Sequence, residues 1–227
     1  MWKSFLILCI SFSSCIAFPE MCTSFHRCRK LAPDNFFPSA ENLEAVCQDM
    51  HKILDCQLEE LAKCADKVLD AVSTSDYEAV VAAFSINLGT KSLVDDLCDS
   101  TTQYHKAYVR NIGCINDTVM DPMAFTSCTS EANALNGSLK FGEDVDDQEH
   151  HCIVNALRYA CFFEEVLKKC GEEAWTIIVE SEKRGKALKY YICTPQSILN
   201  LKTKYLEISD LESKLRIIFE KVFDMKK

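Results

Sequence analysis

The chain has 227 residues, of which 14 are Cys, only 6 are Gly and 5 are Pro, and its formal net charge at pH 7 is −9. So few Gly and Pro residues argue against a fold built from many tight turns and favour a helical one. The acidic balance provides no general basic field, so binding to nucleic acid or to an acidic membrane surface is not expected.

The first residues carry the pattern of a secretory signal. Lys3 precedes an apolar run over residues 5–12, and a small residue stands at position 17. We expect residues 1–17 to be a signal peptide that is cleaved after Ala17, because the run is about half of the roughly 20 apolar residues that a membrane span needs. No other stretch is apolar for long enough, so the protein is expected to be secreted and to have no membrane span.

Removal of residues 1–17 takes away Cys9 and Cys15 and leaves an even number of cysteines, which predicts that all are paired in disulfides in an exported chain. The central three of the first half are repeated in the second half at a nearly constant offset of about 105 residues. This repeat predicts two related units, residues 18–110 and 111–200, followed by a tail at 201–227. The expected disulfide cysteines are Cys22, Cys28, Cys47, Cys56, Cys64, Cys98, Cys114, Cys128, Cys152, Cys161, Cys170 and Cys193.

Apolar residues recur at three- and four-residue steps in both units. The pattern covers residues 43–72 in the first unit and 153–170 in the second, and each predicts a long amphipathic helix. The short apolar run at 175–179 is ambiguous between helix and strand. We therefore predict an all-α fold of two tandem disulfide-stapled helical units, with a C-terminal amphipathic helix that packs on the second unit. The alternative for this last helix is that it binds a partner or a membrane surface. Capping residues mark further helix starts at Ser75, Asp121, Asp146, Thr194 and Ser209.

Helical geometry restricts disulfide pairing within each central triad of cysteines. Cys47 and Cys56 are separated by about 13 Å of helical rise, whereas a disulfide needs Cα atoms within roughly 7 Å. We therefore expect no bridge between members of one triad. Bridges between the two units stay possible, but we expect each member to pair with a flanking cysteine of its own unit, because local pairing costs less chain entropy. Several connectivities stay open in each unit.

The secretory signal and the two six-cysteine helical units, each with a Cys-x8-Cys-x7-or-8-Cys core, resemble the twenty-seven-kilodalton hemolymph glycoproteins of arthropods. They also resemble the related secreted cysteine-rich domains of nematodes, whose function is unknown. The resemblance covers the chain from Cys22 to Cys193. It implies an extracellular, helical, disulfide-bonded protein of body fluid. The family has no established catalytic residues, so none is carried over to this chain.

Two sequons, Asn116-Asp-Thr and Asn136-Gly-Ser, lie in turn-like sequence. We expect both to be exposed and at least one of Asn116 and Asn136 to carry glycan, because the chain has an export signal.

Few residues point to chemistry. Nucleotide-binding glycine patterns, nucleophilic serine motifs and zinc motifs are absent, so neither an enzyme nor a cofactor is expected. His51 and His105 are interpreted as surface or partly packed side chains.

An acidic stretch at 143–149 lies beside His150 and His151 but lacks EF-hand spacing, and we interpret it as a solvated loop that favours the start of the following helix. Metal binding there is left open. Its acids are Glu143, Asp144, Asp146, Asp147 and Glu149.

The functional expectation is a secreted, non-enzymatic binding or interaction protein of body fluid or of a gland secretion. The alternatives are a carrier of small, lipid-like apolar ligands and an enzyme with an unrecognised site. Apolar side chains in the second unit and the tail exceed what one helix seam needs, so an apolar binding surface is expected there, although each is individually more typical of a core residue. These side chains are Phe162, Phe163, Trp175, Ile177, Ile178, Phe219 and Phe223.

Overall fold

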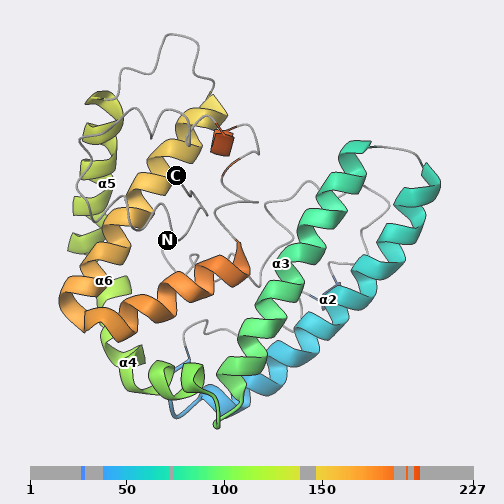
Figure 1. The fold of residues 1–227 in the computed structure, drawn as a ribbon, viewed down its shortest axis with the longest axis horizontal. Helices are drawn as coiled ribbons and strands as arrows, with labels where there is room; N and C mark the ends of the chain where they lie inside the picture. Colours follow the sequence, from blue (N-terminus) through green and yellow to red (C-terminus); the bar gives the residue numbers. More distant parts are fainter. Residues whose placement is uncertain are drawn as a thin grey trace. The chain divides into compact units, whose positions relative to one another are not determined.

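The computed structural model describes residues 27–28, 38–71, 74–138, 147–186, 193 and 197–199. Every regular element in this part of the chain is helical (Figure 1), which confirms the all-α prediction. The chain forms two compact units, Met1–Val109 and Arg110–Lys227, and the division lies next to the predicted boundary after residue 110. The internal repeat stays a prediction, and the tail at 201–227 lies outside the described residues.

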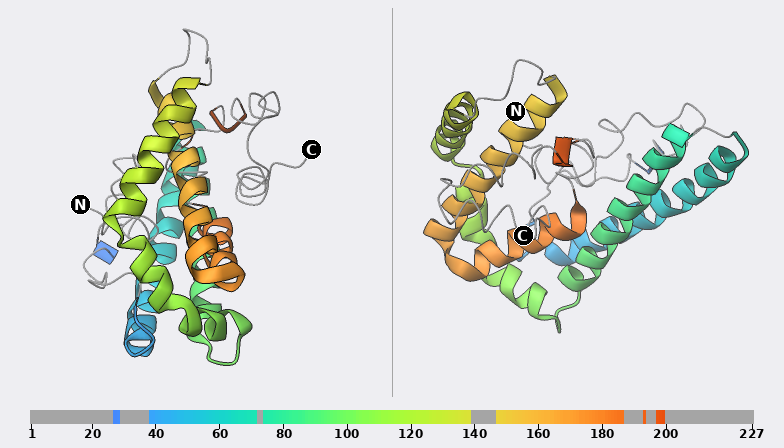
Figure 2. Two further views of the ribbon diagram at one scale, coloured as in Figure 1. Left: turned by 90° about the vertical axis from the view of Figure 1, so that its left-hand side faces the viewer. Right: turned by 45° about the horizontal axis from the view of Figure 1, so that its top comes forward.

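Two long antiparallel helices form the described body of the first unit. They are α2 (Leu43–Ala71) and α3 (Thr74–Cys98), which pack against each other and lie side by side in the right-hand view of Figure 2. α2 confirms the helix predicted over 43–72, and α3 begins next to the predicted start at Ser75. Buried positions alternate at steps of three and four on both helices, the heptad spacing of a coiled-coil pair. These heptad positions are Cys47, Met50, Leu54, Gln57, Leu61 and Cys64 on α2, and Val80, Ala83, Asn87, Thr90, Val94 and Leu97 on α3. Leu43, Ile53 and Glu60 on α2 and Ile86 and Leu93 on α3 are buried as well.

The next helix, α4 (Gln103–Val119), begins at a side-chain cap. Thr102 Oγ1 accepts a hydrogen bond from the backbone N–H of His105 at 3.1 Å, which satisfies one of the free donors of the first turn. The half-buried His105 ring lies with Nδ1 2.6 Å from the Leu97 carbonyl, so Nδ1 carries the proton and donates. Tyr108 donates from its hydroxyl to the Pro38 carbonyl at 3.2 Å, and burial raises the pKa of Tyr108. Residue 109 of this helix is the last residue of the first unit.

Two helices pack together in the second unit, α5 (Pro122–Ser138) and α6 (Asp147–Gly185) (Figure 1). α5 starts where the Asp121-Pro pair predicts, because Asp121 Oδ1 accepts from the Met123 N–H at 2.9 Å. α6 contains the helix predicted over 153–170 and then bends sharply at Gly171, whose φ is +85°. The ambiguous run at 175–179 is helical and follows this bend. Since most of its side chains are buried, packing overrides the β propensity of its branched residues.

Five disulfides are present in the described part of the chain, and each joins a central cysteine to a flanking cysteine of the same unit. This agrees with the expected pairing rule. Cys64 is also disulfide-bonded, and its expected partners include Cys22, which lies outside the described residues. The five bridges are Cys28–Cys56, Cys47–Cys98, Cys114–Cys170, Cys128–Cys161 and Cys152–Cys193.

None of the described helices has the length and apolarity that crossing a membrane requires.

Candidate functional site

Helix α3 has an outer face without charge. From Ala79 to Thr90, over about three helical turns, every side chain is uncharged. The buried positions of α3 face α2, and the positions on the opposite side of the helix reach solvent. Val81 is 47% exposed and Leu88, two turns further along the same stripe, is 56% exposed. We call this surface the α3 outer face; it consists of Val81, Ala82, Ser85, Leu88 and Gly89.

The α3 outer face differs from the exposed side of α2, which carries charges at most positions. On α2, Lys63 pairs with Glu59 at 2.7 Å, and Lys52 pairs with Asp49 at 3.2 Å. Such charged pairs keep a helix surface solvated. A helix that is apolar or uncharged on all sides is ordinarily covered by other protein. The α3 outer face is therefore the described surface of the first unit that is best suited to contact a partner.

A polar layer lies beneath this face, in the seam between α2 and α3. Gln57, Asn87 and Thr90 occupy buried heptad positions that apolar residues fill elsewhere in the seam. Asn87, 1% exposed, donates from Nδ2 to the Ala83 carbonyl at 2.9 Å. Within the described residues, Asn87 Oδ1 and Thr90 Oγ1 find no hydrogen-bond partner. Polar residues at seam positions lower stability and favour one register of the two helices.

Charged residues lie next to the α3 outer face at its C-terminal end. Lys91 Nζ lies 2.9 Å from Asp55 Oδ1 and 4.0 Å from Asp95 Oδ1, and the Asp55 hydrogen bond raises the pKa of Lys91. Asp95 Oδ1 is also 3.5 Å from Nδ1 of His51, which is half-buried. His51 and His105 are thus partly packed side chains, as predicted.

The apolar surface expected in the second unit is not where the sequence places it. Phe163, Trp175, Ile177 and Ile178 are buried, so they belong to the core. Phe162 is half-buried, and the two tail phenylalanines lie outside the described residues. Burial confirms the core interpretation of the four buried residues, so they do not form the exposed apolar surface expected in the second unit.

The acidic stretch is described only from Asp147, the first residue of α6. Glu149 is buried, which contradicts the solvated loop expected for it, whereas His150 and His151 are exposed. Residues 143–146 lie outside the described part. No group of three or more His, Cys, Asp or Glu side chains in the described residues is arranged to hold a metal ion.

The two sequons also differ from expectation, because both lie in helices rather than turns. Asn116 is half-buried within α4, and its sequon threonine, Thr118, is 3% exposed. Asn136 lies in the last turn of α5, where side chains are not described. Turn-like composition at these positions is overridden by the longer helices that contain them.

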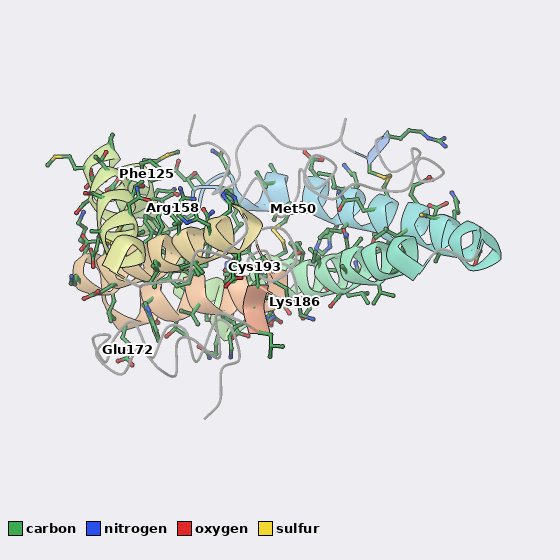
Figure 3. The ribbon with its side chains drawn as sticks, turned by 90° about the horizontal axis from the view of Figure 1, so that it is seen from above. Met50, Phe125, Arg158, Glu172, Lys186 and Cys193 are labelled. Carbon is green, nitrogen blue, oxygen red and sulfur yellow. A yellow bond between two sulfur atoms is a disulfide. The ribbon has the colours of Figure 1, made fainter. Side chains whose placement is uncertain are left out.

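One half-buried cation lies between α5 and α6. The guanidinium carbon of Arg158 lies over the Phe125 ring, 5.5 Å from its centre. Both residues are labelled in Figure 3. Arg158 Nη2 donates to Asn155 Oδ1, and burial lowers the pKa of Arg158. The contact with Phe125 joins α5 to α6, whereas the hydrogen bond to Asn155 lies within α6, and together they give Arg158 a packing role.

The α3 outer face is not among the surfaces expected from the sequence, although the uncharged run at 79–90 could have indicated it. What the sequence alone lacked was the side on which α2 packs. Val109, Met120, Met123 and Leu199 are also exposed. Met120 and Met123 flank the ion pair of Asp121 with Lys169 and do not form an uncharged stripe. No protein-family model, curated protein or solved structure matches the chain.

Proposed function

We propose that this chain is a secreted, non-enzymatic binding protein of extracellular fluid, and that it contacts a protein partner through the α3 outer face. The five disulfides fit an oxidising, extracellular environment. The cysteine layout, which resembles that of the hemolymph glycoproteins, supports a place in body fluid. A signal peptide at 1–17 and glycan at Asn116 or Asn136 belong to the same proposal.

The observation that carries the proposal is the exposure of Val81 and Leu88 on a helix surface that has no charge. Exposed apolar stripes of this kind mark protein contacts, since covering them removes apolar area from water. The outer side of a helix is convex, whereas small-molecule sites are concave. This favours a protein partner over the alternative of a carrier for lipid-like ligands.

A photo-crosslinking amino acid at position 88 tests the proposal. The benzoylphenylalanine variant keeps an apolar side chain at an exposed position, so it should fold like the parent chain. The variant is incubated in the extracellular fluid from which the native protein is purified, irradiated, and analysed by intact mass. The matched control carries the same amino acid at Lys52, which is exposed on the charged side of α2.

The proposal expects a covalent protein adduct of one defined mass at position 88 and none at position 52. Val81→Glu in the same chain should reduce this adduct at least several-fold, about the effect of placing one charge in an apolar contact. Adducts of equal yield at both positions, or no protein adduct at position 88, would overturn the proposed contact. Stoichiometric lipid extracted from the native protein, without a protein adduct, would favour the carrier instead.

A further inference from the structure

The Cys114–Cys170 bridge is the most open of the five disulfides in the described part of the chain. It joins α4 to the last residue before the bend of α6. Both of its cysteines are half-buried, whereas each of the other four bridges has at least one buried cysteine. An incoming thiolate must reach one of the two sulfurs, so access is one of the factors that decide which bridge exchanges first.

A glycine stands beside each cysteine of this bridge. Gly113 precedes Cys114, Gly171 follows Cys170, and both glycines are exposed. Apart from the chain neighbours and the nearby backbone of the same helix, no described atom lies within 4 Å of the position that a Cβ would occupy at either glycine. The positive φ of Gly171 accounts for that glycine, but Gly113 has ordinary helical backbone, where Ala would stabilise α4. The space that a side chain at Gly113 would occupy, next in sequence to Cys114, is open.

A hydroxyl lies against the other sulfur. Thr118 Oγ1 is 3.4 Å from Cys170 Sγ, and the hydroxyl must donate because a disulfide sulfur carries no proton. Thr118 follows Cys114 by one turn of α4, so both residues reach the same end of α6. A donated hydrogen bond stabilises the negative charge that develops on Cys170 Sγ when the bridge opens.

The second unit has other means of holding its fold when this bridge is open. Cys128–Cys161 and Cys152–Cys193 tie α6 to two further segments, and all four of these cysteines are buried. Beyond the bend, α6 is held by buried apolar side chains, namely Ala174, Trp175, Ile177, Ile178 and Val179. Opening of the accessible bridge therefore leaves the core of the unit in place.

We propose that Cys114–Cys170 is a thiol–disulfide exchange site that reacts with dithiols while the protein stays folded. One thiolate of the dithiol attacks Cys114 Sγ, the disulfide bond breaks, and Cys170 leaves as a thiolate that takes a proton from water. The second thiolate of the dithiol then attacks the dithiol's own sulfur in the mixed disulfide, and Cys114 leaves and is protonated. The protein gains two electrons and two protons, and the dithiol becomes a disulfide.

Limited reduction of the oxidised full-length protein tests the proposal. The chain is treated with a low concentration of dithiothreitol at pH 8, quenched with an alkylating reagent, and mapped by peptide mass spectrometry. We expect Cys114 and Cys170 to be alkylated at least about tenfold faster than the cysteines of the other four described bridges, with unchanged helical circular dichroism. This rate should not change in subdenaturing urea, which accelerates bridges that open by unfolding.

Two variants distinguish thiol–disulfide exchange in the folded protein from opening of the bridge that depends on the stability of the fold. Gly113→Leu fills the open space with a good helix former and should slow the opening about threefold or more, whereas Lys106→Leu on the same helix should not. Thr118→Val removes the hydrogen bond to Cys170 and should also slow the opening, which keeps the test valid if Gly113→Leu does not fold. Opening of a buried bridge at the same rate, loss of helix on opening, or unchanged rates in both variants would overturn the proposal.

Discussion

Replacement of Thr90 by Val tests the polar layer between α2 and α3. Thr90 is 3% exposed, and its hydroxyl oxygen finds no hydrogen-bond partner in the described part of the chain. A buried polar group without a partner costs about 1–3 kcal/mol. Val replaces the hydroxyl by a methyl group of similar size, so no cavity forms. We therefore expect Thr90→Val to raise the free energy of unfolding by about 1–2 kcal/mol.

The same substitution at Thr102 is the matched control, with the opposite expected sign. Thr102 Oγ1 accepts from the His105 N–H at 3.1 Å and donates to the Asp99 carbonyl at 3.0 Å, at the start of α4. Thr102→Val removes this cap and should lower the free energy of unfolding by about 1 kcal/mol. Both threonines belong to the first unit, so the two variants report on the same body.

Urea unfolding followed by circular dichroism under non-reducing conditions measures both variants. A change of 1 kcal/mol corresponds to about 2–4 °C in Tm for a chain of this size, so thermal unfolding provides a second measurement. A fall in stability for Thr90→Val would refute the reasoning, because it would mean that the hydroxyl has a partner such as an ordered water. Equal losses of stability in both variants would refute it as well.

Further predictions concern the second unit and the disulfides. Gly171→Ala should lower the free energy of unfolding by about 1–3 kcal/mol because of the positive φ, whereas Gly113→Ala should raise it by about 0.5–1 kcal/mol; thermal unfolding compares them, and effects of the same sign would contradict the prediction. Arg110 of α4 donates to Glu173 and holds the pKa of the Glu173 carboxyl below its ordinary value. The stability contributed by this ion pair is therefore present above the pKa of Glu173 in the unfolded chain and is lost as the pH falls through its pKa in the folded protein. The Tm difference between the parent and Glu173→Gln should therefore vanish well below about pH 4, and a difference that persists in acid would argue against the ion pair. A non-reducing peptide map should show Cys64 bonded to Cys22, and reduction of the mature protein should add about 12 Da; a free thiol in secreted protein would exclude this pairing scheme.

Short-range signals in the sequence were enough to predict much of the helical framework. The Asp121-Pro pair marks the start of α5 because a cap and a helix-compatible φ act within one turn. The apolar periodicity over 43–72 marks α2 because a helix buries one stripe of its surface whatever covers it. Helical rise, which depends on distance along one helix alone, excluded bridges within each triad, and the lower chain entropy cost of local closure favoured bridges within each unit.

Tertiary packing decided what a local pattern could not. The run at 175–179 is helical because its side chains are buried after the bend at Gly171, and Asn116 lies in a helix although its neighbours are typical of turns. Which flanking cysteine each central cysteine meets depends on how separate helices pack, for example α4 against α6 at Cys114–Cys170.

The α3 outer face likewise depends partly on the sequence and partly on tertiary packing. Its lack of charge is a property of the sequence from Ala79 to Thr90 and needs no structure to be found. That Val81 and Leu88 face solvent while Asn87 and Thr90 are buried was decided only by the packing of α2 on one side of α3. The physical reason is that periodicity defines the faces of a helix, whereas burial of a face requires a second element to remove it from water.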